Sequence, residues 1–171
     1  SLIHTFGTAG TGGFSNYALS VAHFESAYID GVITVFMILF GINFSLYYLL
    51  LLREFKPVWK NEELRTYLGI ILAAALIITV NINYIYGNPL TSFRYAIFQV
   101  ASIITTTGFA TANYVEWPML SQTILMFLMV VGACASSTGG GIKVSRLIMA
   151  VKSIKRSIQQ MVHPKSVNII R

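Results

Sequence analysis

The chain contains three long apolar runs. Residues 28–52 carry a single charge, Asp30, close to the start of the run, and residues 66–86 carry none. At about 1.5 Å per residue, a helix over either run would cross a hydrocarbon core of roughly 30 Å. The third run, residues 117–135, is of borderline length and ends in the glycine-rich SSTGGGIK. We expect this run to form a membrane helix that breaks before it has finished crossing.

The connection between the second and third runs is itself apolar, which is unusual for a segment that leaves the membrane. In LTSFRYAIFQVASIITTTGF, residues 90–109, apolar side chains recur at helical spacing. Asn88 can cap this helix and Pro89 suits its first turn. Its length to Ser102, about 20 Å, reaches the middle of a membrane without crossing it. We therefore expect a re-entrant helix and an irregular returning strand, which must be buried in protein or face a water-filled path.

The returning strand has a counterpart near the start of the chain. An offset of 95 residues places Thr11 and Gly13 over Thr106 and Gly108, within TAGTGGFSN and ITTTGFATA. Backbone carbonyls can replace the water shell of a cation, and glycine lets successive carbonyls point toward one axis. Small residues also serve as helix-packing surfaces in membranes, which is the alternative interpretation. Recurrence at equivalent places favours the ion path.

Composition and charge agree with a membrane protein. Hydrophobic residues make up 55 % of the 171 residues and charged residues 11 %, with a net charge of +6, an unusual balance for a soluble domain. Of the twelve Lys and Arg residues, four lie in the link between the first two runs and seven follow the third run. The positive-inside tendency places both regions in the cytoplasm. The single cysteine, Cys134, fits no disulfide or metal pattern.

Several titratable positions have two interpretations each. Arg94 could pair with an outer carboxylate such as Glu116 or anchor its helix at the membrane interface. Lys143 could repel cations or contact an acidic partner, or simply end a cytoplasmic helix. His4 could pack in a short helix or relay protons. Residues 144–161 form a predicted basic amphipathic helix, suited to anionic lipid at the inner membrane surface or to a neighbouring helix.

The stretches HTFGTAGTGGFSN, FRYAIFQVASIITTTGFATANYVEWP and GACASSTGGGIKVSRL, together with VFMILFGINF and NEELRTYLGIILA, resemble the TrkH-type potassium-translocating subunits of the Trk/Ktr/HKT superfamily. The resemblance implies an all-α integral membrane protein of helix, pore helix, helix repeats with re-entrant filter strands. It makes Gly13 and Gly108 the key filter glycines of two units. The filter backbone that would bind potassium is then Gly10, Thr11, Gly12, Gly13, Thr105, Thr106, Thr107 and Gly108.

The resemblance also gives the glycine-rich stretch a role. It implies a loop within the membrane, below the filter, that obstructs the ion path and moves during gating. That gating loop comprises Ser136, Ser137, Thr138, Gly139, Gly140 and Gly141, followed by Lys143. Each of the three glycines destabilises a helix by about 1 kcal/mol relative to alanine, in keeping with a broken helix.

The expected organisation is that of a partial chain. Residues 1–52 would hold the end of a pore helix, a filter strand and an outgoing helix, and residues 53–65 a cytoplasmic link. Residues 66–171 would hold a complete second pore unit with a broken outgoing helix and the basic tail. Because a full subunit has four units, we expect the two missing ones elsewhere in the same, longer transporter; the alternative is that several chains assemble.

The expected function is potassium uptake across the inner (plasma) membrane, with no enzymatic activity, no bound cofactor and no nucleic acid. The transported ion is K⁺, and the resemblance supplies this identity. It also implies a homodimer, contact with membrane lipid and a cytoplasmic nucleotide-binding regulatory subunit of the TrkA type. The alternatives are a non-conducting membrane scaffold and, less well supported, a carrier for an organic solute.

Overall fold

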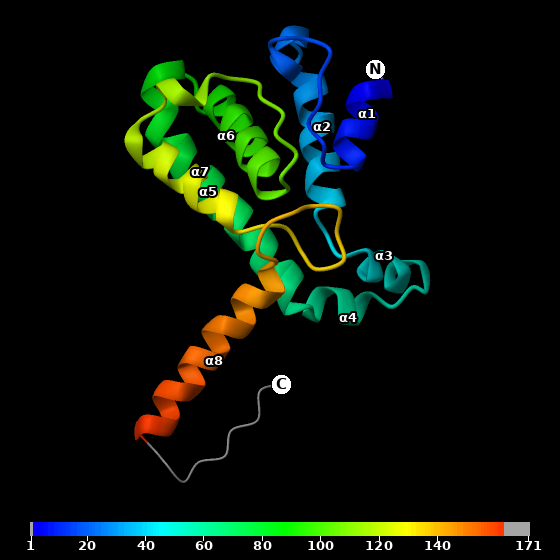
Figure 1. Cartoon of the computed structure of the whole chain (residues 1–171). Helices are drawn as coiled ribbons and strands as arrows, with labels where there is room; N and C mark the ends of the chain where they lie inside the picture. Colours follow the sequence, from blue (N-terminus) through cyan, green and yellow to red (C-terminus); the bar gives the residue numbers. More distant parts are fainter. Residues whose placement is uncertain (1, 163–171) are drawn as a thin grey trace.

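The computed structural model describes residues 2–162, which fold into helices joined by irregular segments (Figure 1). The helices are α1 (Leu2–Ala9), η1 (Ser20–Phe24), α2 (Ala27–Phe40), α3 (Phe44–Leu51), α4 (Phe55–Lys60), α5 (Glu62–Tyr86), α6 (Pro89–Ile104), η2 (Tyr114–Glu116), α7 (Met119–Val130) and α8 (Val144–Val162). Within the described residues no β-strand occurs; Val131 and Ile142 form an isolated bridge. The tail residues beyond 162 lie outside the described part.

Helix α5 is the long apolar helix that the second run predicts. Its 25 residues are apolar enough to cross a membrane. Asn61 caps its start by accepting a hydrogen bond from the Leu64 amide at 2.9 Å, and Gly87, in the left-handed conformation, ends it. One face of α5 packs on α6 and α7, while the opposite face is exposed. The buried face carries Tyr67, Ile71, Ala74, Ile78 and Ile82.

Helix α6 begins as the sequence predicts and ends two residues later than expected. The Asn88 side chain accepts from the Leu90 amide at 3.0 Å, and Pro89 occupies the first turn. The helix continues past Ser102 to Ile104. It is buried on several sides, because α5, α7 and α2 all contact it. Its sixteen residues span about 24 Å at helical rise, less than a membrane core.

The first apolar run forms two helices instead of the single helix we expected. Helices α2 and α3 are bent by 92° around residues 41–43. A Cβ atom at Gly41 would lie 2.2 Å from the Tyr67 hydroxyl oxygen, so only glycine allows α5 to approach this closely. The Asn43 side chain then accepts from the Ser45 amide at 2.9 Å and starts α3 in a new direction.

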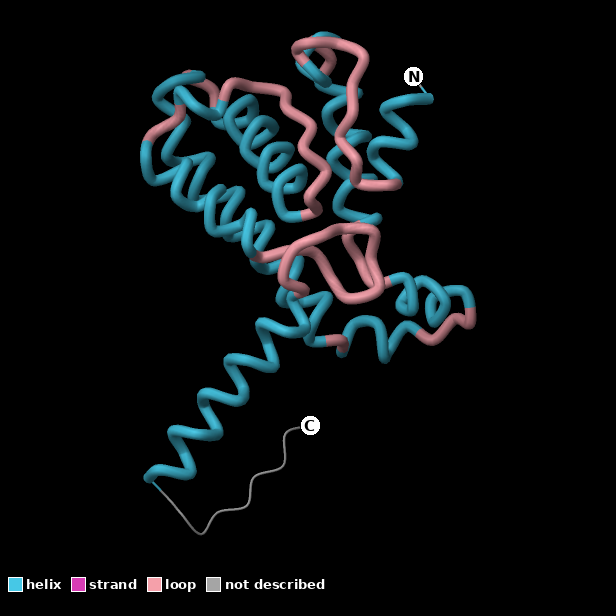
Figure 2. The backbone as a smooth tube through the Cα atoms, viewed as in Figure 1, coloured by secondary structure: helices cyan, strands magenta, loops and turns pink. Residues whose placement is uncertain are grey.

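The helices form two groups that lie side by side (Figure 2). The first group is α1 and α2, and the second is α5, α6 and α7. Apolar side chains fill the space between them: Val21, Met37, Phe98, Ala101 and Phe109. The loop of residues 131–143 runs across the ends of both groups, and α8 extends away from them.

One ion pair also joins the two groups. Arg94 of α6 lies with its Nε 3.5 Å from the Oδ2 of Asp30 in α2, and the Asp30 side chain is only 7 % exposed. The guanidinium also lies over the Tyr95 ring, 4.7 Å from its centroid. Glu116, the example named for such a partner, instead accepts a hydrogen bond from the Asn113 side chain at 2.7 Å. Arg94 therefore pairs with a carboxylate at the outer rim, as one interpretation had it, but that carboxylate is Asp30 and not Glu116.

Removing Arg94 should destabilise the protein. Arg94→Ala leaves the Asp30 carboxylate buried without its cation, at a cost of about 2 kcal/mol; the cost stays moderate because the Arg94 side chain is one-third exposed. Thermal unfolding of the intact detergent-solubilised protein should show a lower melting temperature. Arg65→Ala removes an exposed arginine of α5 and should leave the melting temperature unchanged. Equal shifts in both variants would contradict a role for the pair.

Candidate functional site

The two threonine–glycine turns have positive φ angles at equivalent residues. We call residues 10–13 the first turn and residues 105–108 the second turn. Thr11 and Thr106, one in each, have positive φ angles of 50° and 58°, and Gly13 and Gly108 have φ angles of 63° and 87°. Left-handed backbone is rare for a β-branched residue and costs roughly 1–2 kcal/mol. Its recurrence at matched threonines shows that each turn is held in place by its surroundings.

The hydrogen bonds of the two turns match as well. The amides of Gly12 and Gly13 both donate to the Gly7 carbonyl, at 2.9 and 3.5 Å. Ninety-five residues later, the amides of Thr107 and Gly108 both donate to the Ser102 carbonyl, at 2.9 and 3.3 Å. Each turn therefore folds back under the last helical turn of its own short helix, α1 or α6. The internal repeat seen in the sequence is thus a repeat of backbone structure.

The two turns touch each other. A Cβ atom added at Gly13 would lie 1.8 Å from the Thr107 carbonyl oxygen, a distance no side chain could accept. The second turn is braced from within, because the hydroxyls of Thr105 and Thr107 lie 2.8 Å apart and the Ser102 hydroxyl donates to the Phe109 carbonyl at 2.6 Å. The two strands are therefore neighbours packed directly, backbone against backbone.

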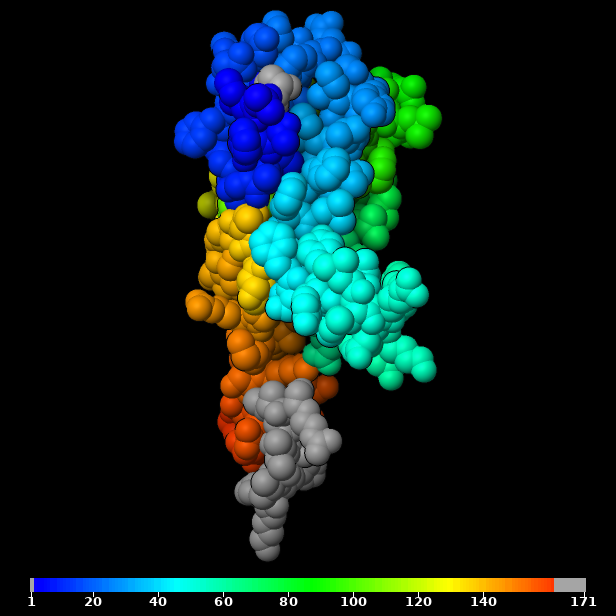
Figure 3. All heavy atoms as spheres, turned by 90° about the vertical axis from the view of Figure 1, so that its right-hand side faces the viewer, coloured from blue at the N-terminus to red at the C-terminus, as the bar shows by residue number. Residues whose placement is uncertain are grey.

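The 131–143 loop contacts both turns at their equivalent threonines. The Thr11 hydroxyl donates to the Thr138 carbonyl at 2.9 Å, and the Gly140 amide donates to the Thr106 hydroxyl at 2.7 Å. Between these two contacts, a Cβ atom at Gly139 would lie 3.0 Å from the Thr105 carbonyl oxygen. Figure 3 shows the loop, in yellow and orange, directly below α1 on this face. The loop thus lies against the ends of both turns.

The loop is also attached to the break between α2 and α3. The Cys134 amide donates to the Gly41 carbonyl at 3.0 Å, and the Phe44 amide donates to the Ser136 carbonyl at 3.1 Å. The Thr138 hydroxyl donates to the Phe40 carbonyl at 3.3 Å. Backbone groups that α2 frees by ending early are therefore satisfied by the loop.

Glycines allow the loop to close on itself. The Gly132 amide donates to the Ile142 carbonyl at 2.8 Å, and the Ile142 amide donates to the Val130 carbonyl at 3.1 Å. A Cβ atom at Gly132 would lie 2.0 Å from the Gly140 carbonyl oxygen. Gly141 has a φ of 73°, which favours glycine. Helix α7 ends at Val130, short of a full crossing, as the glycine-rich stretch predicts.

The structure brings together the residues that the sequence singles out. The turn residues Gly10 to Gly13 and Thr105 to Gly108 adjoin one another, and Thr138, Gly139 and Gly140 lie against them. The Ser136 carbonyl reaches Phe44, the Ser137 hydroxyl donates to the Cys134 carbonyl at 2.6 Å, and the Lys143 ammonium donates to the Gly139 carbonyl. Lys143 therefore braces the loop internally, a contact that neither interpretation of this residue included.

Sequence reasoning missed Gly41 and Gly132. Their requirement for glycine comes from backbone or side chains distant in the chain, so no local pattern could reveal it. His4 packs as one interpretation had it: it is 4 % exposed, lies between the Phe24 and Phe109 rings, and hydrogen-bonds the Ser15 hydroxyl at 3.1 Å. Among the described residues, no group of three or more His, Cys, Asp or Glu could hold a metal ion.

The described residues thus form an all-α fold of apolar helices, two short helices that end in matched turns, and a loop laid across those turns. Residues 77–171 match the family model described as "TrkH: Cation transport protein". This chain belongs to the TrkH family, whose members are transporters and not enzymes. The family resemblance and the all-helical fold class expected from the sequence are thus confirmed.

Individual proteins similar to this chain are members of the same family. The chain is 37 % identical to the Trk system potassium uptake protein TrkH of Salmonella typhimurium, and 34 % identical to that of Escherichia coli K12. Each alignment covers 98 % of this chain and 35 % of the relative. The crystal structure of the potassium transporter TrkH from Vibrio parahaemolyticus matches with a TM-score of 0.91 at 33 % identity, over 98 % of this chain and 37 % of that one. The chain thus spans about a third of the length of these relatives.

The contact between the turns predicts a specific sensitivity at Gly13. Gly13→Ala should prevent the two turns from packing, because the new Cβ would overlap the Thr107 carbonyl oxygen. We expect a loss of several kcal/mol of stability or a failure to fold, measured by thermal unfolding of the intact protein.

Gly87→Ala is the matched control. Gly87 has a φ of 64°, close to the 63° of Gly13, but a Cβ there meets nothing within 4 Å. It should therefore cost only the backbone strain of roughly 1–2 kcal/mol. Equal losses in the two variants would show that the turns do not pack as described.

Proposed function

We propose that this chain is part of a transporter that takes up potassium ions, with the two turns as strands of its selectivity filter. The filter backbone comprises Gly10, Thr11, Gly12, Gly13, Thr105, Thr106, Thr107 and Gly108. The observation that carries the proposal is the matched pair of turns: positive φ angles at equivalent residues, equivalent hydrogen bonds and direct contact between them. Carbonyls repeated around one axis can replace the hydration shell of a cation without introducing fixed charge.

Helix geometry supports a cation over an anion. Helices α1 and α6 both end at the turns, so the negative ends of their dipoles lie there, which favours a cation by up to about 1 kcal/mol per helix. The relatives' printed names specify potassium uptake, and we carry that ion over to this chain. Two turns make half a ring, so two further pore units of the same transporter complete it.

The second element of the proposal is a gate. The 131–143 loop, with Ser136, Ser137, Thr138, Gly139, Gly140, Gly141 and Lys143, obstructs the path below the filter and moves when the path opens. Its hydrogen bonds to Thr11 and Thr106 support this role, because they hold the loop directly against both turns. Its glycines leave it few side chains and little helix propensity to resist a change of shape.

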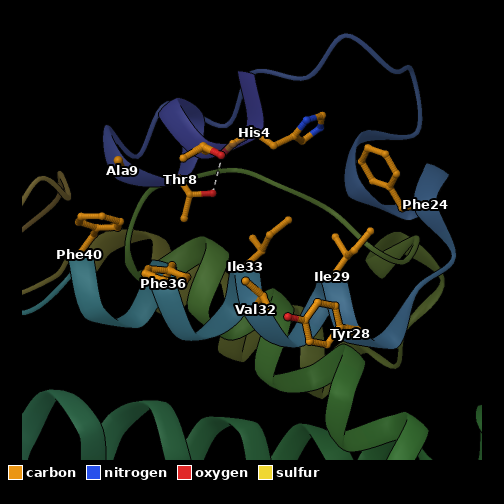
Figure 4. Close-up of a pocket in the computed structure, with 11 residues that line it drawn as sticks. His4, Thr8, Ala9, Phe24, Tyr28, Ile29, Val32, Ile33, Phe36 and Phe40 are labelled. Atoms are coloured by element: carbon orange, nitrogen blue, oxygen red, sulfur yellow. Dashed lines mark hydrogen bonds between the residues drawn. The ribbon is translucent and has the colours of Figure 1, made fainter. Parts of the chain in front are cut away.

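A groove beside α1 supports the proposal that more of the transporter packs here. The groove encloses about 340 Å³ between α1 and α2 and is lined by Thr5, Ala9 and apolar residues of α2 (Figure 4 draws it from the side). In the repeat, Thr5 and Ala9 correspond to Val100 and Ile104, which are buried in the core that α5 shares. A helix equivalent to α5, from the rest of the same transporter, would fill the groove.

Helix α8 supports the remaining parts of the proposal. Its apolar side chains Val151, Ile154, Ile158 and Met161 are exposed, and its other faces carry Lys152, Lys155 and Arg156. Such a helix suits anionic lipid at the inner surface of the plasma membrane, with residues 53–65 and the tail in the cytoplasm. We propose the same region for docking of a TrkA-type nucleotide-binding subunit, and a homodimer as the assembly.

Substitution at the second turn tests the filter. In vesicles containing the full-length parent protein, Gly108→Ser should reduce the preference for rubidium, a potassium tracer, over sodium by about tenfold or more. The reason is that serine resists a φ of 87° and would turn neighbouring carbonyls away from the path. Gly87→Ser, which puts the same side chain at a left-handed position distant from the turns, should leave selectivity unchanged.

Two outcomes would favour the alternatives. Unchanged selectivity after Gly108→Ser would overturn the filter assignment. Loss of assembly, with normal selectivity in the protein that survives, would instead support a scaffold in which the turns only pack helices.

A further inference from the structure

The carboxylate of Glu63 accepts hydrogen bonds from two segments, the 131–143 loop and the start of α8. Its Oε1 accepts from the Ala135 amide at 2.6 Å and from the Ser145 amide at 3.3 Å. Ala135 lies in the first part of the loop, and Ser145 in the first turn of α8. Glu63 itself belongs to the first turn of α5, 72 residues before Ala135. One side chain therefore joins α5, the loop and α8.

Without Glu63, neither amide would have an acceptor within its own helix or loop. The first amides of a helix have no acceptor within that helix, and Ser145 is one of these. Ala135 lies between two residues that hold the α2–α3 break: the Cys134 amide donates to Gly41, and the Ser136 carbonyl accepts from Phe44. A carboxylate acceptor makes a stronger hydrogen bond than a neutral one. Removing the Glu63 charge therefore weakens the hydrogen bond that holds Ala135 of the loop to α5.

A different part of the loop meets the turns. Thr138 and Gly140 reach Thr11 and Thr106, three to five residues beyond the Glu63 contact at Ala135. The loop is thus held by hydroxyls of the turns, by the break between α2 and α3, and by the carboxylate of α5. Because Glu63 also bonds the first turn of α8, a displacement of α8 from α5 would strain the contact that fixes Ala135.

We propose that Glu63 is a positioning residue for the 131–143 loop, and that it couples the place of the loop beneath the turns to the place of α8. The coupling would let a partner that moves α8 release the loop. This proposal rests on the gating role proposed above, but the position of the loop can be measured without any ion flux.

Glu62 provides a matched control on the same helix turn. It forms an ion pair with Lys152 of α8, and its side chain is 63 % exposed. Glu62→Gln removes the same charge but leaves the Glu63 contacts to Ala135 and Ser145 in place, and an exposed ion pair contributes little to holding α8. Glu62 has no hydrogen bond to the loop in the described structure. Any effect of a charge lost at this junction in general should therefore appear in both variants. Glu63→Asp, which keeps the charge near Cys134, separates the lost contact from the lost charge.

Cys134 is a built-in reporter of loop position. It adjoins Ala135, and its side chain is fully buried. In the full-length protein, with cysteines outside these 171 residues replaced by serine, the rate of Cys134 labelling by a maleimide should rise about tenfold in Glu63→Gln. That factor corresponds to weakening one charge-assisted hydrogen bond. Glu62→Gln should label at the wild-type rate. Glu63→Asp, which keeps the charge but shortens the reach, should label faster than wild type and serves if Glu63→Gln does not fold.

Each possible result either supports or overturns the proposal. Labelling of Glu63→Gln at the wild-type rate, equal acceleration in Glu62→Gln, or acceleration in Glu63→Gln with none in Glu63→Asp would overturn the proposal. Rubidium flux measured on the same preparations separates it from the proposed function. Faster labelling with faster flux supports both, while faster labelling with unchanged flux supports Glu63 as a positioning residue and counts against the loop as the gate.

Discussion

The arrangement depends on hydrogen bonds between one loop and two threonine hydroxyls. Thr11 and Thr106 occupy equivalent left-handed positions where glycine would be less strained, so their hydroxyls provide what glycine cannot. Each hydroxyl contacts the 131–143 loop, at the Thr138 carbonyl and the Gly140 amide. Two residues further along, Gly13 must remain glycine because the Thr107 carbonyl fills the space of its Cβ. The hydrogen bonds to the loop thus explain the threonines at strained positions, and the contact between the turns explains the glycine two residues after Thr11.

Two broken helices make this arrangement possible. Helix α2 stops at Phe40 and α7 at Val130, and each break frees backbone groups that must find partners away from water. They find them largely in one another, since loop amides and carbonyls pair with the Gly41 carbonyl and the Phe44 amide. Hydrogen bonds in a low-dielectric interior are strong but can be exchanged for others. The gating movement proposed above would have to exchange this small set of hydrogen bonds for others.

The sequence predicts the parts of this structure that depend on local pattern. The span of α5, the Asn88–Pro89 start of α6, the early end of α7 and the offset between the turns all follow from periodicity, capping and glycine content. What it does not predict depends on contacts between distant residues. Gly41 looks like an ordinary glycine in a membrane helix until Tyr67 is placed beside it, and Arg94 finds Asp30 only through packing of the two groups. Glu63 likewise resembles a simple first-turn carboxylate of α5.

The central claim is that the two turns are adjacent strands of one cation path. Anomalous scattering from thallium or rubidium, soaked into crystals of the full-length protein in place of potassium, tests it directly. The account predicts an ion within coordination distance of backbone carbonyls in both turns, on the side of the turns away from the 131–143 loop. Ion density that avoids both turns, in protein that transports the same ion, would contradict it.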